Sequence, residues 1–251
     1  MKITKILSLM ALMAIAISCS KDDDDPQPNV ENIELSFSGD TQILEVPQGL
    51  LQSEDLKAQE VTAWVSLANG LSSNLAFFNP GAGATKSTEL ITPANGRTSA
   101  SKGVVYYWHH DAYGSVAYQI RDEEDKYIFE FLLKRVGETD WFRMIYAEEQ
   151  KDRSAGYMAL YDVEGTAEEA RQPTARWDWT RKGDLFTFKF VSANNEINLT
   201  LTVNTKTKAG SVVSSPANVK QSEIKWEANG SGSWKIFDDT GAVVEEGSWT
   251  A

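Results

Sequence analysis

The chain has 251 residues, of which 41% are hydrophobic and 24% charged, a composition typical of a globular protein. Its 24 basic and 36 acidic residues give a net charge of −12. Such an acidic surface argues against nucleic acid as a partner, because phosphates need a basic patch, and against adsorption to anionic membranes. The single cysteine, Cys19, excludes an intrachain disulfide, a zinc site built on cysteines and, given its position, a catalytic thiol.

Residues 1–18 have the pattern of a secretory signal peptide. Lys2 and Lys5 supply a positive start, and a mostly apolar run covers residues 6–17. A membrane-spanning helix needs about 20 apolar residues, so this run is too short to serve as one. We therefore predict that residues 1–18 are a signal peptide.

The signal peptide ends in the tetrapeptide Ala16-Ile17-Ser18-Cys19. This sequence resembles the lipobox of bacterial lipoproteins, in which a peptidase cleaves before the cysteine and the thiol is acylated. Ala16 departs from the leucine that is usual in the family, whereas the small Ser18 fits. The resemblance implies that Cys19 is the lipid-modified first residue of the mature protein and its membrane anchor. The alternative is a plain secretory signal with an incidental cysteine.

Residues 19–31 are predicted to be a solvated acidic tether, because four adjacent carboxylates and two prolines cannot pack in a core. The charges directly after the cysteine resemble the export signal of Bacteroidota lipoproteins, which routes a protein to the outer face of the outer membrane. The resemblance implies an export signal made of Lys21, Asp22, Asp23, Asp24 and Asp25. The alternative is a generic acidic linker.

Residues 32–251 are expected to form one domain, beginning with a strand at 33–37. A chain break at Pro47-Gln48-Gly49 precedes a segment, 54–78, whose apolar residues recur every three to five positions and predict a helix. Ser53 is the expected N-cap, and Asn69-Gly70 is expected to bend or split the helix. A helix lying on a membrane would carry more basic residues, so we predict that this one packs on a sheet. The polar stretch from Gly81 to Ser101 is expected to be a flexible loop.

Short runs rich in β-branched and aromatic residues recur from Gly103 to the C-terminus, separated by turn sequences such as Asn229-Gly230. They predict a mainly β fold: a long antiparallel meander that forms a curved sheet or open barrel, with one N-terminal helix packed on it. The architecture is similar to the half-barrel of lipoprotein carriers of the LolA and LolB type. The expected strands are 104–110, 115–121, 126–133, 141–147, 156–163, 174–180, 184–191, 196–203, 209–214, 221–227, 232–237 and 243–249.

The two halves of this meander differ in polarity. The later strands alternate between apolar and polar residues, so one of their faces is expected to contact water. The earlier strands, such as 126–133 and 141–147, are apolar on both sides. We predict that the helix at 54–78 covers the second face of the earlier strands.

Trp177 and Trp179 are the most suggestive candidate binding residues, because side chains at i and i+2 share one face of a strand. They could stack a sugar ring or a flat apolar ligand if that face is open, or belong to the core if it is closed. Phe186, Phe188 and Phe190 follow in phase and favour the core. The two adjacent histidines, His109 and His110, are expected to point to opposite faces and not to share a metal.

These patterns contain no known catalytic fingerprint, and we expect a non-enzymatic protein without a cofactor or a metal. The leading hypothesis is a carrier of a small apolar ligand or envelope component, with a cavity between sheet and helix lined by Trp64, Phe77 and strand aromatics. A second is a surface glycan-binding protein that presents exposed Trp or Tyr. A third is a structural or partner-binding module without a small ligand.

Overall fold

The computed structural model describes residues 33, 35, 44–73, 80, 83–96, 102–110, 114–162 and 172–251. Cys19, the acidic tether and Phe77 lie outside these residues. None of the helices in these residues combines the length and the hydropathy that a membrane-spanning helix requires.

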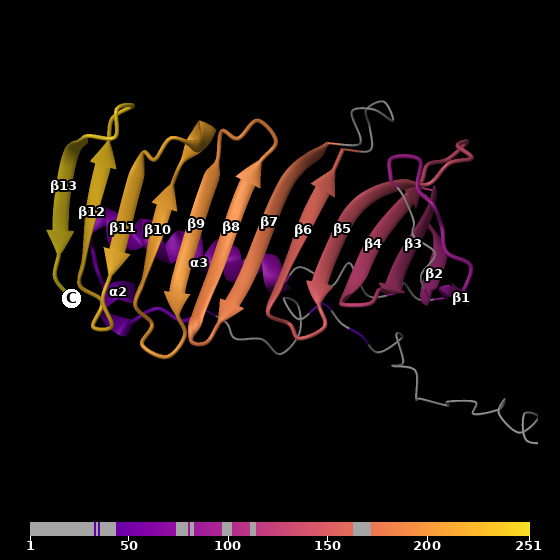
Figure 1. The fold of residues 1–251 in the computed structure, drawn as a ribbon, viewed down its shortest axis with the longest axis horizontal. Helices are drawn as coiled ribbons and strands as arrows, with labels where there is room; N and C mark the ends of the chain where they lie inside the picture. Colours follow the sequence, from indigo (N-terminus) through magenta and orange to yellow (C-terminus); the bar gives the residue numbers. More distant parts are fainter. Residues whose placement is uncertain are drawn as a thin grey trace, which may run out of the picture.

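The described residues form one antiparallel sheet in which each strand pairs with the next in sequence (Figure 1). The sheet is curved and does not close, because β1 and β13 lie at its two ends. Each of the twelve strands predicted between 104 and 249 is present, which confirms the mainly β meander. The strands are β1 (Thr85–Ser87), β2 (Lys102–His110), β3 (Gly114–Asp122), β4 (Lys126–Lys134), β5 (Phe142–Gln150), β6 (Ala155–Tyr161), β7 (Pro173–Lys182), β8 (Leu185–Ser192), β9 (Asn198–Asn204), β10 (Gly210–Ser214), β11 (Ser222–Trp226), β12 (Gly232–Phe237) and β13 (Val243–Trp249).

Helix α3 (Leu56–Ser73) confirms the predicted helix, and its buried side chains Ala58, Val61, Val65 and Ala68 pack on one face of the sheet. We call this the helix face, and the opposite one the outer face. A short helix, α2 (Gln48–Leu51), precedes α3, and a 3-10 turn, η4 (Pro216–Asn218), follows β10. In Figure 1, α3 crosses the later strands, from β12 to β7.

Three local predictions around α3 were wrong. The N-cap is Asp55, whose carboxylate accepts hydrogen bonds from the backbone N–H groups of Lys57 (2.8 Å) and Ala58 (3.2 Å). The helix is also not split at Asn69-Gly70: it continues through Asn69, whose side-chain amide pairs with both backbone groups of Leu44 (2.8 and 2.9 Å). Ile33 and Leu35, the described residues of the first expected strand, lie in no strand, although Leu35 is buried in the core.

The expected loop at 81–101 and the expected cover of the early strands also need correction. Thr85–Ser87 is strand β1, paired with β2. On the outer face, Leu90, Ile91 and Trp141 pack against the buried side chains Val105, Ala117 and Leu132. The outer face of the early strands is therefore covered by the segment after β1, whereas α3 belongs to the core on the helix face.

Candidate ligand-binding pocket

A pocket with a volume of about 580 Å³ opens on the helix face of the early strands. Seven of its ten lining residues are apolar. The lining residues are Trp108 and His110 of β2, Val116 of β3, Phe131 and Leu133 of β4, Met144 and Ile145 of β5, Leu160 and Tyr161 of β6, and Thr174 of β7. We call this cavity the apolar pocket.

Two β-bulges place additional residues at the apolar pocket. In a regular strand these residues would point to the opposite face of the sheet. Between β4 and β5 the register shifts so that Met144 is an extra residue, and Met144 and Ile145 both line the pocket. Between β6 and β7 the register shifts so that Thr174 is the extra residue. Bulges bend a strand, redirect a side chain and occur often beside functional sites. Both irregularities lie at the pocket.

The polarity of the pocket changes from its interior to its rim. Val116, Leu133 and Ile145 are buried. His110 and Thr174 are exposed. Trp108 meets Phe131 edge to face, with ring centroids 6.1 Å apart and an angle of 68° between the planes, a favourable aromatic geometry. The pocket can therefore surround an apolar body and leave a polar end at the rim.

The three tryptophans that the sequence singled out do not form this pocket. Trp177 and Trp179 are 3% and 1% exposed and belong to the core, which rules out an open stacking platform and confirms the alternative interpretation. Trp177 instead stacks on Phe190, with centroids 6.4 Å apart. Trp64 is half-buried against the core and is not among the lining residues of the pocket.

The sequence does not single out the pocket residues, because the strand residues around them are equally rich in aromatics. The apolar residues on both faces of the early strands do indicate that these strands have something on each side. They do not indicate which side chains border a cavity. The bulges that place Met144 and Thr174 depend on the partner strand, and the local sequence does not reveal them.

No protein-family model matches the chain, and no curated protein matches it significantly. Function is therefore inferred from the chemistry of the described residues. Among them, no cluster of histidine, cysteine and carboxylate side chains could hold a metal ion. His110 lines the apolar pocket and His109 lines a groove on the outer face, in agreement with the expectation that they point apart.

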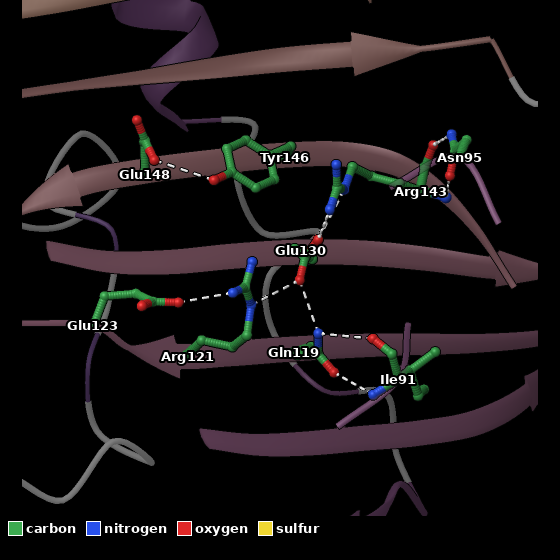
Figure 2. Close-up of polar contacts among 9 residues, drawn as sticks. All are labelled: Ile91, Asn95, Gln119, Arg121, Glu123, Glu130, Arg143, Tyr146 and Glu148. Atoms are coloured by element: carbon green, nitrogen blue, oxygen red, sulfur yellow. Dashed lines mark hydrogen bonds and ion pairs between the residues drawn. The ribbon is translucent and has the colours of Figure 1, made fainter. Parts of the chain in front are cut away.

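A buried polar network lies on the outer face of the early strands, behind the pocket (Figure 2). Its centre is Glu130, which is fully buried and accepts hydrogen bonds from Gln119 (2.8 Å), Arg121 (3.1 Å) and Arg143 (2.8 Å, from Nε). Arg121 also pairs with Glu123 at 2.8 Å. Buried charges are tolerated only when they are paired and hydrogen-bonded, and this network satisfies that condition.

Beside this network, the hydroxyl of Tyr146 donates a hydrogen bond to Glu148 (3.1 Å). Burial, and then the negative charge of Glu148, raise the pKa of Tyr146 well above its ordinary value. Burial also raises the pKa of the neighbouring Tyr157. A tyrosine with a raised pKa stays protonated at neutral pH, so no phenolate is present there to act as a general base.

Proposed function

We propose that this protein is a lipid-anchored protein of the outer membrane, displayed on the cell surface, that binds a small apolar or amphiphilic molecule without transforming it. The observation that carries the proposal is the apolar pocket. Its volume of about 580 Å³ falls in the range of about 300–1,000 Å³ that small-molecule sites occupy. Such sites combine a mostly apolar lining with a few placed polar groups, as this one does.

The distribution of polar groups favours a ligand with one polar end. His110, Tyr161 and Thr174 supply an imidazole and two hydroxyls, and His110 and Thr174 are exposed. A fatty acid or a similar single-headed lipid can bury its chain between Phe131, Leu133 and Ile145 and keep its head group hydrated. A ligand that is polar throughout would lose hydrogen bonds to water in this pocket without replacing them.

The proposed location rests on the sequence before the domain. Cys19 in its lipobox-like context would carry the lipid anchor, and Lys21 with the four aspartates that follow would direct export. A carrier or receptor for a hydrophobic molecule gains from such a position, because ligands of this kind concentrate at membranes.

The ligand hypothesis can be tested with the chain from Ser20 to Ala251, which keeps every residue that the structure describes. Titration with the fluorescent fatty acid cis-parinaric acid should give saturable binding with one site per chain. Leu160→Trp should weaken this binding at least tenfold, because a larger side chain at a half-buried lining position fills the pocket. Ile197→Trp is the matched control, since Ile197 is 46% exposed and lies outside the pocket.

A second variant tests the orientation of the ligand with a substitution at an exposed position. Thr174→Glu puts a carboxylate at the rim and should weaken binding of the fatty acid more than binding of its methyl ester, because like charges repel. Circular dichroism would establish that each variant is folded. Failure of the unchanged chain to bind the probe would overturn the proposal and favour a structural or partner-binding module.

A further inference from the structure

A second cavity, with a volume of about 770 Å³, lies on the outer face, on the opposite side of the early strands from the apolar pocket. We call it the outer groove. It lies between the sheet and the segment that follows β1. Its polar and aromatic lining includes side chains from β1 (Thr85, Ser87), the segment after it (Glu89, Thr92), β2 (Tyr107), β3 (Ser115), β4 (Lys134) and the residue before β5 (Trp141).

Strand pairing explains why these side chains meet. Thr85 pairs with Tyr107, which pairs with Ala117 on its other side, and Ala117 pairs with Leu132. Directly paired residues in antiparallel strands point to the same face. Val105, Ala117 and Leu132 thus form a buried apolar cluster, against which Trp141 packs. Val105 lines the outer groove and is its apolar floor.

Two aromatic rings border this floor from different elements. Tyr107 is 40% exposed, and Trp141 is half-buried. The ammonium group of Lys134 lies 5.0 Å from the centroid of the Trp141 ring. Partly exposed Trp and Tyr combine a large flat apolar surface with a polar atom, which suits a ligand that is apolar on one side and polar on its edge.

The rim of the outer groove is rich in hydroxyl groups and has balanced charge. Thr85, Ser87, Thr92 and Ser115 each offer a hydroxyl that can both donate and accept a hydrogen bond. Glu89 and Lys134 supply one charge of each sign. This rim suits a neutral polyhydroxylated ligand better than an anion or a cation, because neither sign of charge predominates.

The wall of the outer groove is held in place by two side-chain amides that act as strand partners. Gln119 accepts a hydrogen bond from the backbone N–H of Ile91 (2.7 Å) and donates one to its carbonyl (3.2 Å). Asn95 does the same with the backbone of Arg143 (2.7 and 3.0 Å). Gln119 is itself bonded to Glu130, so the buried network in Figure 2 fixes this wall. A site that is already ordered loses less entropy on binding.

We infer that the outer groove is a saccharide-binding site, in which one or a few neutral sugar rings lie against Tyr107 and Trp141 and hydrogen-bond to the hydroxyl rim. A sugar ring has an apolar face of C–H groups and an edge of hydroxyls, the combination that this groove offers. The site shares one lining residue, Trp108, with the apolar pocket but opens on the opposite face, and it does not depend on the proposed function. The two cavities open on opposite faces, so both can be occupied at once.

The inference can be tested with the chain from Ser20 to Ala251 and soluble oligosaccharides, four to six sugars long, of glucose, mannose, xylose and N-acetylglucosamine. Isothermal titration calorimetry should reveal saturable binding to at least one of them. Thr85→Trp should weaken that binding at least tenfold, because an exposed position beside Tyr107 then carries a ring that blocks the groove. Thr180→Trp is the matched control, an exposed threonine on the outer face of β7.

Substitutions of the aromatic groups complete the test. Tyr107→Ala should weaken saccharide binding at least tenfold, whereas Tyr107→Phe, which keeps the ring, should retain most of it. Leu160→Trp in the apolar pocket should leave saccharide binding unchanged, and Thr85→Trp should leave cis-parinaric acid binding unchanged, so the two proposals fail independently. Absence of binding to every oligosaccharide, or binding that Thr85→Trp does not alter, would overturn the inference.

Discussion

The indole ring of Trp226 lies over Gly210, its partner on the neighbouring strand. A Cβ atom added to Gly210 would lie 2.4 Å from Cζ2 of Trp226 and 2.3 Å from the backbone oxygen of Thr202. Trp226 cannot move aside easily, because it is 2% exposed and its N–H donates a hydrogen bond to the carbonyl of Lys208 (2.7 Å). The same arrangement recurs in three further cross-strand pairs: Gly156 with Trp179, Gly232 with Trp249, and Gly247 with Trp234.

Gly210→Ala should therefore destabilise the domain. Forcing a methyl group into a packed core typically costs about 1–3 kcal/mol, and here both the ring and the backbone oppose it. The free energy of unfolding from urea titration would measure the loss.

Gly70→Ala in α3 is the matched control, since a Cβ there would meet no atom of another described element within 4 Å. Alanine loses less backbone entropy than glycine in a helix, so this substitution should raise stability by about 0.5–1 kcal/mol. Equal effects of the two substitutions would show that the Trp226 ring does not constrain Gly210.

The meander could be predicted from sequence because its pairings are local. Each strand pairs with its neighbour in the chain, so alternation and turn sequences such as Asn229-Gly230 determine both the strands and their order. Gly230 has a φ of +96°, which glycine adopts without strain. The turn and the strands on either side of it required no information from distant residues.

The outer face of the early strands could not be predicted in the same way. Residues 83–96 are polar and contain glycine and proline, which locally favours a loop. The conformation of this segment is fixed by two long-range contacts. Gln119 hydrogen-bonds to the backbone of Ile91, 28 residues away, and Asn95 pairs with the backbone of Arg143, 48 residues away. The sequence did show that both faces of the early strands are apolar. The helix, however, does not cover their outer face; the segment after β1 does.

Glu130 should be essential to the stability of the early strands. Glu130→Gln keeps the size of the side chain but removes the buried negative charge that Arg121 and Arg143 share, although Arg121 still pairs with Glu123. Breaking a buried ion pair typically costs about 3–5 kcal/mol. Guanidinium chloride unfolding should show a large loss of stability for Glu130→Gln.

The matched control is Glu246→Gln, whose side chain is 63% exposed and pairs with Lys235 at 3.4 Å. Exposed ion pairs contribute little, so this substitution should leave the unfolding midpoint within error of the unchanged chain. A Glu130→Gln protein as stable as this control would mean that the two arginines find other partners at no cost.

Stability should fall at alkaline pH, in part because of Tyr146. Its pKa is raised in the folded protein, mainly by burial, so the hydroxyl keeps its proton at a pH where the unfolded chain ionises. The contribution is complete below the ordinary tyrosine pKa of about 10 and is lost as the pH rises above it. The urea midpoint of the unchanged chain should therefore decrease above about pH 10, and less steeply for Tyr146→Phe. Parallel curves for the two proteins would contradict this assignment.

The charges that follow Cys19 are expected to direct the export of the protein. Replacing Lys21 and Asp22 to Asp25 by alanine should leave the protein lipidated but change the membrane face on which it is displayed, because these charges are predicted to form the export signal. Protease treatment of intact cells should then digest the unchanged protein and spare the variant. Cys19→Ser is the control that separates anchoring from export: it should release the protein or leave its precursor uncleaved, as intact mass and membrane fractionation would show. Equal digestion of both lipidated proteins would reduce residues 21–25 to a plain linker, and an unchanged mass and membrane fraction for Cys19→Ser would exclude the anchor itself.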